Sequence, residues 1–264
     1  GFTHKPFLVQ DPEHSNQAVR INGHYCLLTV SLCIGQKVVQ RAWAEQLAGP
    51  WTIEPEPILA PGTADAFDAK HVDTISGYYF PRRDTLLYFY KGYPLHPQPR
   101  SISPYGAARA AAVEHLGGGS IIKLGPILPP CPVPGHWAAG WVGGLQLVPG
   151  ASVGSPHRWI GILNASPTAP DPTNPALWRD EPPPSLGGLA WCDEAWPVKG
   201  WHWAAEPFEW IEALPPEAVA AGEGVNLWRH HLLVLPNGRL TLFYNSGPYG
   251  REQLYLKVAE SSRA

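Results

Sequence analysis

Two groups of residues have types and spacings that could perform acid–base or binding chemistry. The first is the stretch His71-Val72-Asp73-Thr74, where a carboxylate follows an imidazole just before an apolar run. Asp65 and Asp68 precede it on the same loop, and ordinary loop capping accounts for them. In a pocket walled by aromatic side chains, partial desolvation would raise the pKa of the Asp73 carboxyl. Asp73 is therefore our first candidate for a catalytic acid or base, with His71 beside the substrate.

The second group runs from Glu223 to His231 and combines an acid, an aromatic ring, a guanidinium and two imidazoles. Glu223 is the candidate for a second carboxylate, and Arg229 and His230 could hold a hydroxyl, a carboxylate or a phosphate. In a regular strand Arg229 and His231 would share one face and His230 the other, so both imidazoles could not enter one pocket. The alternative is that one imidazole belongs to the core and the other faces solvent.

Strand-like runs recur in a fixed order around these groups. An apolar run is followed by a turn, an aromatic-rich run, a third run that ends on an acid, and a closing Gly-Trp or Gly-Pro segment. The aromatic-rich runs are 25–30, 86–90, 159–163 and 240–244, the third runs are 41–45, 110–114, 189–193 and 256–260, and the closing segments are 49–52 and 200–203.

This repeat predicts an all-β fold, a β-propeller, because neighbouring blades must cover the faces that one unit cannot bury alone. Four blades can be counted within a single domain over residues 1–264. Phe7-Leu8-Val9 resembles a fourth strand, and we expect this N-terminal strand to close the last blade. Helical periodicity is absent, apart from one possible turn over 216–222.

Composition limits the classes of partner. The formal net charge of -3 gives no sign of nucleic-acid binding, and no apolar run is long enough to span a membrane. The four cysteines show no CxxC spacing, so we expect free and mostly buried thiols, with no metal site and no cofactor. The absence of methionine, even at position 1, indicates a processed or trimmed chain. No signal peptide opens it, and the compartment stays open between secreted, periplasmic and cytoplasmic.

Aromatic residues are the expected sugar platforms, because a ring face stacks on the apolar C–H face of a sugar. Trp141 and Trp228 each precede an expected inner strand, and Tyr244 ends an aromatic-rich run near the same rim. Trp43 and Trp191 lie in third strands and are expected to pack between blades instead.

The repeats resemble the five-bladed propeller glycoside hydrolases, the superfamily around the arabinanase and xylosidase family 43 and the mannoside phosphorylase family 130. The residues that carry the resemblance are Gly49-Pro50-Trp51-Thr52 with Pro57-Ile58-Leu59, His71-Val72-Asp73-Thr74, the second-strand motifs at 87–90 and 242–245, and Ala259-Glu260-Ser261. The resemblance implies five blades, and carboxylates at the inner-strand starts of three of them. The expected starts here are 16–18, 72–74, 142–144 and 228–230, and only Asp73 among them is acidic.

The resemblance implies hydrolysis of a glycosidic bond in an oligosaccharide or polysaccharide, held in a central pocket. Such cleavage needs one group to protonate the leaving oxygen and another to activate water or attack carbon. Asp73 and Glu223 are the expected pair, with His71, Trp141, Trp228, Arg229, His230 and Tyr244 binding substrate. Two alternatives stay open: a propeller that binds carbohydrate without cleaving it, and a phosphorylase with one acid and a basic phosphate site.

Overall fold

We describe the fold from a computed structural model of the chain. It describes residues 3–14, 17–95, 108–167, 185–207, 226–235, 238–247 and 253–258.

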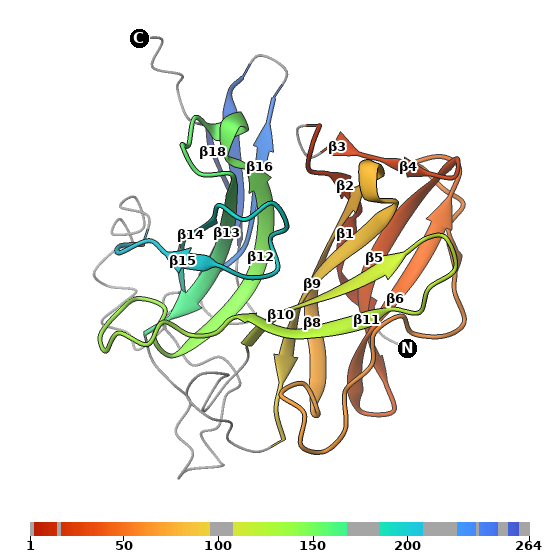
Figure 1. The fold of residues 1–264 in the computed structure, drawn as a ribbon, viewed down its shortest axis with the longest axis horizontal. Helices are drawn as coiled ribbons and strands as arrows, with labels where there is room; N and C mark the ends of the chain where they lie inside the picture. The colour runs from red at the N-terminus through yellow and green to blue at the C-terminus, as the bar shows by residue number, and fades with distance from the viewer. Residues whose placement is uncertain are drawn as a thin grey trace.

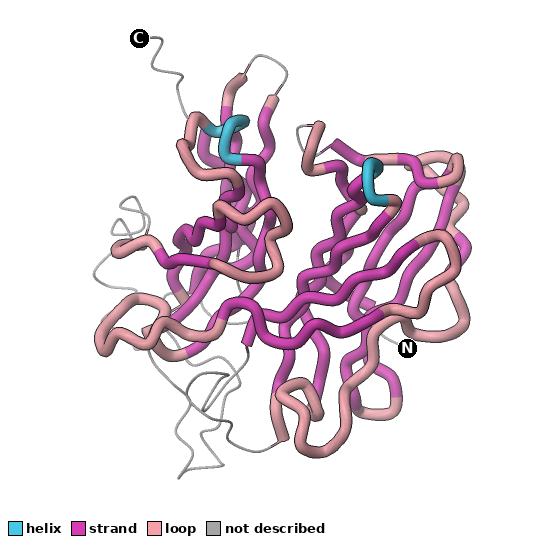
Figure 2. The backbone as a smooth tube through the Cα atoms, viewed as in Figure 1, coloured by secondary structure: helices cyan, strands magenta, loops and turns pink. Residues whose placement is uncertain are grey.

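Strands make up more than half of the described chain and form four sheets, which we call blades I to IV (Figures 1 and 2). Blade I contains β1 (Thr3–Leu8), β4 (Arg20–Ile21), β5 (His24–Cys33), β6 (Gln36–Ala44) and β7 (Thr52–Ile53). Blade II contains β8 (His71–Phe80), β9 (Thr85–Tyr93), β10 (Ala108–His115) and β11 (Ile122–Leu128), with β2 (Gln10–Asp11) and β3 (Gln17–Ala18) beside β8. Blade III contains β12 (Trp141–Pro149), β13 (Trp159–Ser166), β14 (Leu186–Cys192) and β15 (Trp201–Trp203). Blade IV contains β16 (Asn226–Val234), β17 (Leu240–Gly247) and β18 (Gln253–Val258).

The blades follow one another as in a β-propeller, which confirms the predicted fold class. Each predicted second run lies in a central strand, and each predicted third run lies mostly in the strand that pairs with it. The first long strands are β1, β8, β12 and β16; β1, β12 and β16 lie at one end of their sheets, and β8 is followed there only by the short β2 and β3. Neighbouring first strands adjoin one another from β1 to β16. These four are the inner strands.

One predicted pairing is wrong. The N-terminal strand does not pair with blade IV: β1 pairs antiparallel with β5, with Phe7 opposite Leu28 and Leu8 opposite Leu27. The reason is that, among the described residues, only the two-residue β4 otherwise pairs with β5 on this side, so β1 serves as the inner strand of blade I. Gln17 and Ala18, two of the three residues expected to start it, form the short β3 at the edge of blade II. The inner strand of blade I therefore carries Lys5 where we had looked for Gln17.

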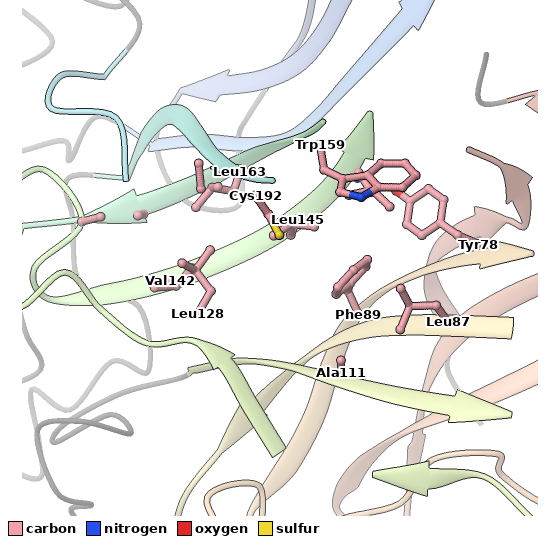
Figure 3. Close-up of a cluster of buried hydrophobic side chains, with 14 of the residues drawn as sticks. Tyr78, Leu87, Phe89, Ala111, Leu128, Val142, Leu145, Trp159, Leu163 and Cys192 are labelled. Atoms are coloured by element: carbon pink, nitrogen blue, oxygen red, sulfur yellow. The ribbon is translucent and has the colours of Figure 1, made fainter. Parts of the chain in front are cut away.

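Apolar side chains fill three cores, each between two consecutive blades. Strand β9 shows the reason for its long apolar run. Leu86, Tyr88 and Tyr90 face blade I, while Leu87 and Phe89 alternate with them toward blade III (Figure 3). Trp43 packs partly buried between blades I and II, and Trp191 does so between III and IV, as expected.

The cysteines and the short helical segments were also subjects of prediction. All four cysteines are free, and Cys33 is the exposed one. The helical segments of the described chain are two 3-10 turns, Pro81–Arg83 and Gly150–Val153, and neither has the length or character to cross a bilayer. Residues 216–222 lie outside the described part of the chain.

Candidate active site in the central cavity

Each inner strand contains a β-bulge, in which two residues oppose one on the partner strand. The register shifts lie between His4 and Phe7 in β1, Asp73 and Ser76 in β8, Val142 and Leu145 in β12, and Trp228 and His231 in β16. The bulged pairs are Lys5-Pro6, Thr74-Ile75, Gly143-Gly144 and Arg229-His230. A bulge bends its strand, so four of them at matching positions separate the four backbones there.

These bulges surround a cavity of about 230 Å³. All four inner strands line it, and Arg109 enters from β10. The lining residues are Lys5, Pro6, Phe7, Thr74, Ile75, Ser76, Arg109, Gly144, Leu145, Gln146, His230 and His231. This convergence agrees with the central pocket that the family resemblance implies.

Asp73 lies beside the cavity and is completely buried. Lys5 donates to its Oδ1 and Lys37 to its Oδ2, both at 2.7 Å, and the Thr74 backbone N–H also donates to Oδ1 at 2.6 Å. Burial alone would raise the pKa of this carboxyl, but the two lysines outweigh it and hold the pKa well below its usual range. The predicted rise in pKa is therefore wrong, and Asp73 is ionised at neutral pH.

Arg109 is also fully buried, at the start of the alanine-rich strand β10. Its guanidinium donates to the carbonyl of Thr74 at 2.6 Å and to that of Phe89 at 2.9 Å, groups next to the β8 bulge. Within the described chain no acceptor lies within hydrogen-bond distance of its Nε, and no carboxylate pairs with it. Burial lowers the pKa of Arg109 to about 9, so it is still cationic at neutral pH.

Side chains connect neighbouring inner strands around the cavity. Ser76 donates its hydroxyl to the carbonyl of Leu145 at 2.6 Å, which joins β8 to β12. The Gln146 amide accepts from the Leu232 backbone N–H at 2.6 Å and donates to its carbonyl at 2.9 Å, which joins β12 to β16. These hydrogen bonds connect three of the four inner strands directly beside the cavity.

Glycine is required in the β12 bulge for lack of space. A Cβ on Gly143 would lie 2.3 Å from Oδ1 of Asn164, the residue opposite the bulge. A Cβ on Gly144 would lie 2.8 Å from the Thr74 methyl of the adjacent blade. The same Asn164 oxygen accepts from the Gly144 backbone N–H at 3.0 Å, so one side chain both fills and stabilises the bulge.

His230 and His231 both line the cavity, although a regular strand would turn one of them away. The bulge in β16 changes the alternation, which corrects our expectation. Burial lowers the pKa of His230 to about 3 and also lowers the pKa of His231, so both imidazoles are uncharged at neutral pH. They provide neutral polar groups opposite the cations.

Several predicted binding residues lie elsewhere. Trp141 is fully buried beneath the Lys91 ammonium, which sits 4.5 Å from its ring centroid, so no face is open to a sugar. Tyr244 is buried opposite the β16 bulge and stacks on His230. His71 accepts from the Lys37 backbone N–H at 3.2 Å and is absent from the cavity lining.

Three candidates lie wholly or partly outside the described residues. Glu223 lies outside the described residues, so its place relative to Asp73 stays a prediction. For Trp228 and Arg229 only the backbone in β16 is described.

Sequence reasoning missed Lys5, Arg109 and Gln146. Gln146 did leave a signal, because it is the lone polar residue of an otherwise apolar strand, and Arg109 left a weaker one as a charge at the start of a run of alanines. Lys5 left none, since its role depends on β1 being an inner strand.

Several solved structures are similar to this chain in fold. The chain aligns over 98% of its length with 69% of a structure titled glycoside hydrolase, with a TM-score of 0.61 and 13% identity. It aligns over 97% of its length with 67% of a B. megaterium levansucrase mutant (TM-score 0.59, 8% identity). A Penicillium chrysogenum α-L-arabinanase with bound arabinobiose matches over 97% of this chain and 62% of its own (TM-score 0.55, 13% identity).

The chain shares its β-propeller fold with these proteins. No protein-family model and no curated protein matches it. At 8–13% identity the comparison establishes the fold, and the chemistry must be argued from the cavity.

Proposed function

We propose that this protein is a carbohydrate-active enzyme that hydrolyses a glycosidic bond in its central cavity. The observation that carries the proposal is the meeting of four bulged inner strands around one cavity with a charged aspartate beside it. The shared fold with glycoside hydrolases supports it by analogy.

Asp73 takes the role that an ionised carboxylate can fill. Hydrolysis develops positive charge on the sugar ring and needs a base or nucleophile that stays ionised. The two lysine partners hold Asp73 in that state, so it is not the proton donor. The donor assigned here is Glu223.

A second candidate function is carbohydrate binding without cleavage. Both oxygens of Asp73 are already occupied, and the described cavity lining contains no carboxylate. A substrate reaches Asp73 only where Lys5, the partner that lines the cavity, releases its oxygen. If Lys5 keeps its contact with Asp73, the protein binds carbohydrate without cleaving it.

The test is a panel of aryl and natural glycosides, assayed with the wild type, Asp73→Asn and Glu223→Gln. For an enzyme we expect each substitution to lower turnover by about 10²–10⁴-fold while sugar binding persists. Asp193→Asn is the matched control, because Asp193 is an exposed acid that accepts from His157 and the Arg158 backbone N–H, outside the cavity. Binding of sugars with no turnover by the wild type would establish the second function instead.

A further inference from the structure

The charges on the cavity wall are unbalanced. Lys5 and Arg109 line the cavity, and within the described chain no aspartate or glutamate does. The carboxylate of Asp73 pairs with Lys5 and Lys37 and also favours the charged form of Arg109 from a distance, so one negative charge is shared among three cations. Arg109 donates to main-chain carbonyls and has no carboxylate partner among the described residues.

A buried cation without a counter-ion is costly, since the protein interior replaces water poorly as a solvent for charge. The structure shows this cost at Arg109, whose pKa is lowered by burial. Its Nε is a donor that no described acceptor satisfies. An anionic group in the cavity would supply the missing negative charge.

The remaining walls suit a sugar. Thr74, Ser76 and Gln146 contribute polar side chains, and Phe7 contributes an aromatic ring in T-shaped contact with His231 at 6.2 Å. The volume of about 230 Å³ is below the range for drug-sized ligands and fits a single sugar unit. The imidazoles of His230 and His231 are uncharged at neutral pH, so Lys5 and Arg109 supply the positive charge of the described cavity wall.

We propose that the central cavity selects a sugar unit that carries an acidic group, held by Lys5 and Arg109. The shared chemistry is one anionic substituent on a sugar ring, either the carboxylate of a uronic acid or a phosphate ester. This inference rests on the proposed function for the use of a carbohydrate, and adds the charge of the substrate.

The experiment compares matched ligands by calorimetry. The first arm uses uronic-acid oligosaccharides against the same oligosaccharides with the carboxyl reduced to a hydroxymethyl group. The second arm uses hexose phosphates against the parent hexoses, with inorganic phosphate alone as a reference. We expect an acidic ligand in one arm to bind about 10- to 100-fold more tightly than its neutral counterpart, the size of a charge-assisted hydrogen bond.

Variants show whether the two cations are responsible. Lys5→Gln is expected to reduce the ratio of acidic to neutral affinity toward one, and Lys5→Arg to preserve it. Arg109→Gln should act in the same direction, and Lys5→Gln keeps the test valid if that buried substitution prevents folding. Arg82→Gln is the matched control, because its side chain is 86% exposed on a surface turn and lines no part of the cavity.

The outcomes separate this inference from the proposed function. Equal affinity for acidic and neutral ligands would overturn the charge selection and leave carbohydrate binding intact. An acidic preference that survives Lys5→Gln would place the anion outside this cavity. Absence of binding for every sugar tested would overturn both proposals.

Discussion

The protonation state of Asp73 is decided by its partners rather than by its burial. Desolvation is the largest single influence on this carboxyl and favours the neutral form. Two ammonium groups at 2.7 Å reverse the result. Lys5 comes from blade I and Asp73 from blade II, so the charge of the carboxylate depends on how two blades pack.

The two imidazoles of the cavity make stability depend on pH. The folded-state pKa of His230 is lowered to about 3, and that of His231 is also lowered, so the unfolded chain takes up these protons first. Stability is therefore complete above the unfolded pKa of about 6.5 and falls as the pH drops toward the folded value. We expect urea unfolding between pH 7 and 4.5 to show a slope of up to about 1.4 kcal/mol per pH unit for each imidazole.

The variant His230→Gln should reduce that slope by the contribution of one imidazole, which is up to about 1.4 kcal/mol per pH unit. The window lies above the range in which Asp73 contributes. A carboxyl with a lowered pKa loses its stabilising effect only as the pH falls below the unfolded value of about 3.9. An unchanged slope in His230→Gln would mean that this imidazole protonates equally in the folded and unfolded states.

At the scale of the element, the bulge is the feature that produces the site. Each of the four inner strands has two residues opposite one at the same level, and residues from each bulge line the cavity. Without the bulges, each inner strand would continue its regular pairing with its partner strand at this level. The positive φ angles of Lys5 and Thr74, 55° and 43°, show that two of the bulges hold non-glycine residues in a left-handed conformation.

The contact between the β8 and β12 bulges can be tested with a pair of substitutions. Gly144→Ala places a methyl group 2.8 Å from the Thr74 methyl, and we expect overpacking to cost about 1–3 kcal/mol. Thr74→Ser removes that methyl group. The double variant should recover at least about 0.5 kcal/mol relative to the sum of the single changes, measured by chemical denaturation.

Additive effects in this double-mutant cycle would show that the methyl groups do not meet. Gly154→Ala is an unsuitable comparison because Gly154 has a φ of 70°, while Gly117→Ala has open space and serves as the control.

The sequence predicted the elements better than their irregularities. The aromatic run at 86–90 identified a central strand because burial on both faces demands continuous apolar residues, and the run at 240–244 likewise lies in a central strand. The bulges left a local signal only at Gly143-Gly144. In β1, β8 and β16 they depend on register with another strand, which no short window of sequence records. The same limit explains why Asp73 was found and its lysine partners were not.

At the scale of the whole molecule, β1 has a different task from the one we expected. It is the inner strand of blade I, it supplies Lys5 to Asp73 in blade II, and its Phe7 meets Tyr78 of blade II at 5.7 Å. Blades I and II are thus joined by the first residues that the structure describes (Figure 1).

Deletion of residues 1–8 should lower the melting temperature and expose amides in β5, the strand that pairs with β1. Hydrogen exchange provides the measurement, because it reports each strand separately. We expect β5 to lose protection while β17 of blade IV keeps it. Loss of protection in β17 with β5 unchanged would restore the original expectation that this strand completes the last blade.

The central cavity also links ligand affinity to the integrity of the ring. Because its walls come from all four blades, local opening of any one blade would remove part of the binding surface. A ligand that binds only the closed arrangement would therefore stabilise all four blades at once, by about 2.7 kcal/mol at a concentration of 100 times its Kd. The occupied protein would then unfold as a more cooperative unit than the empty one.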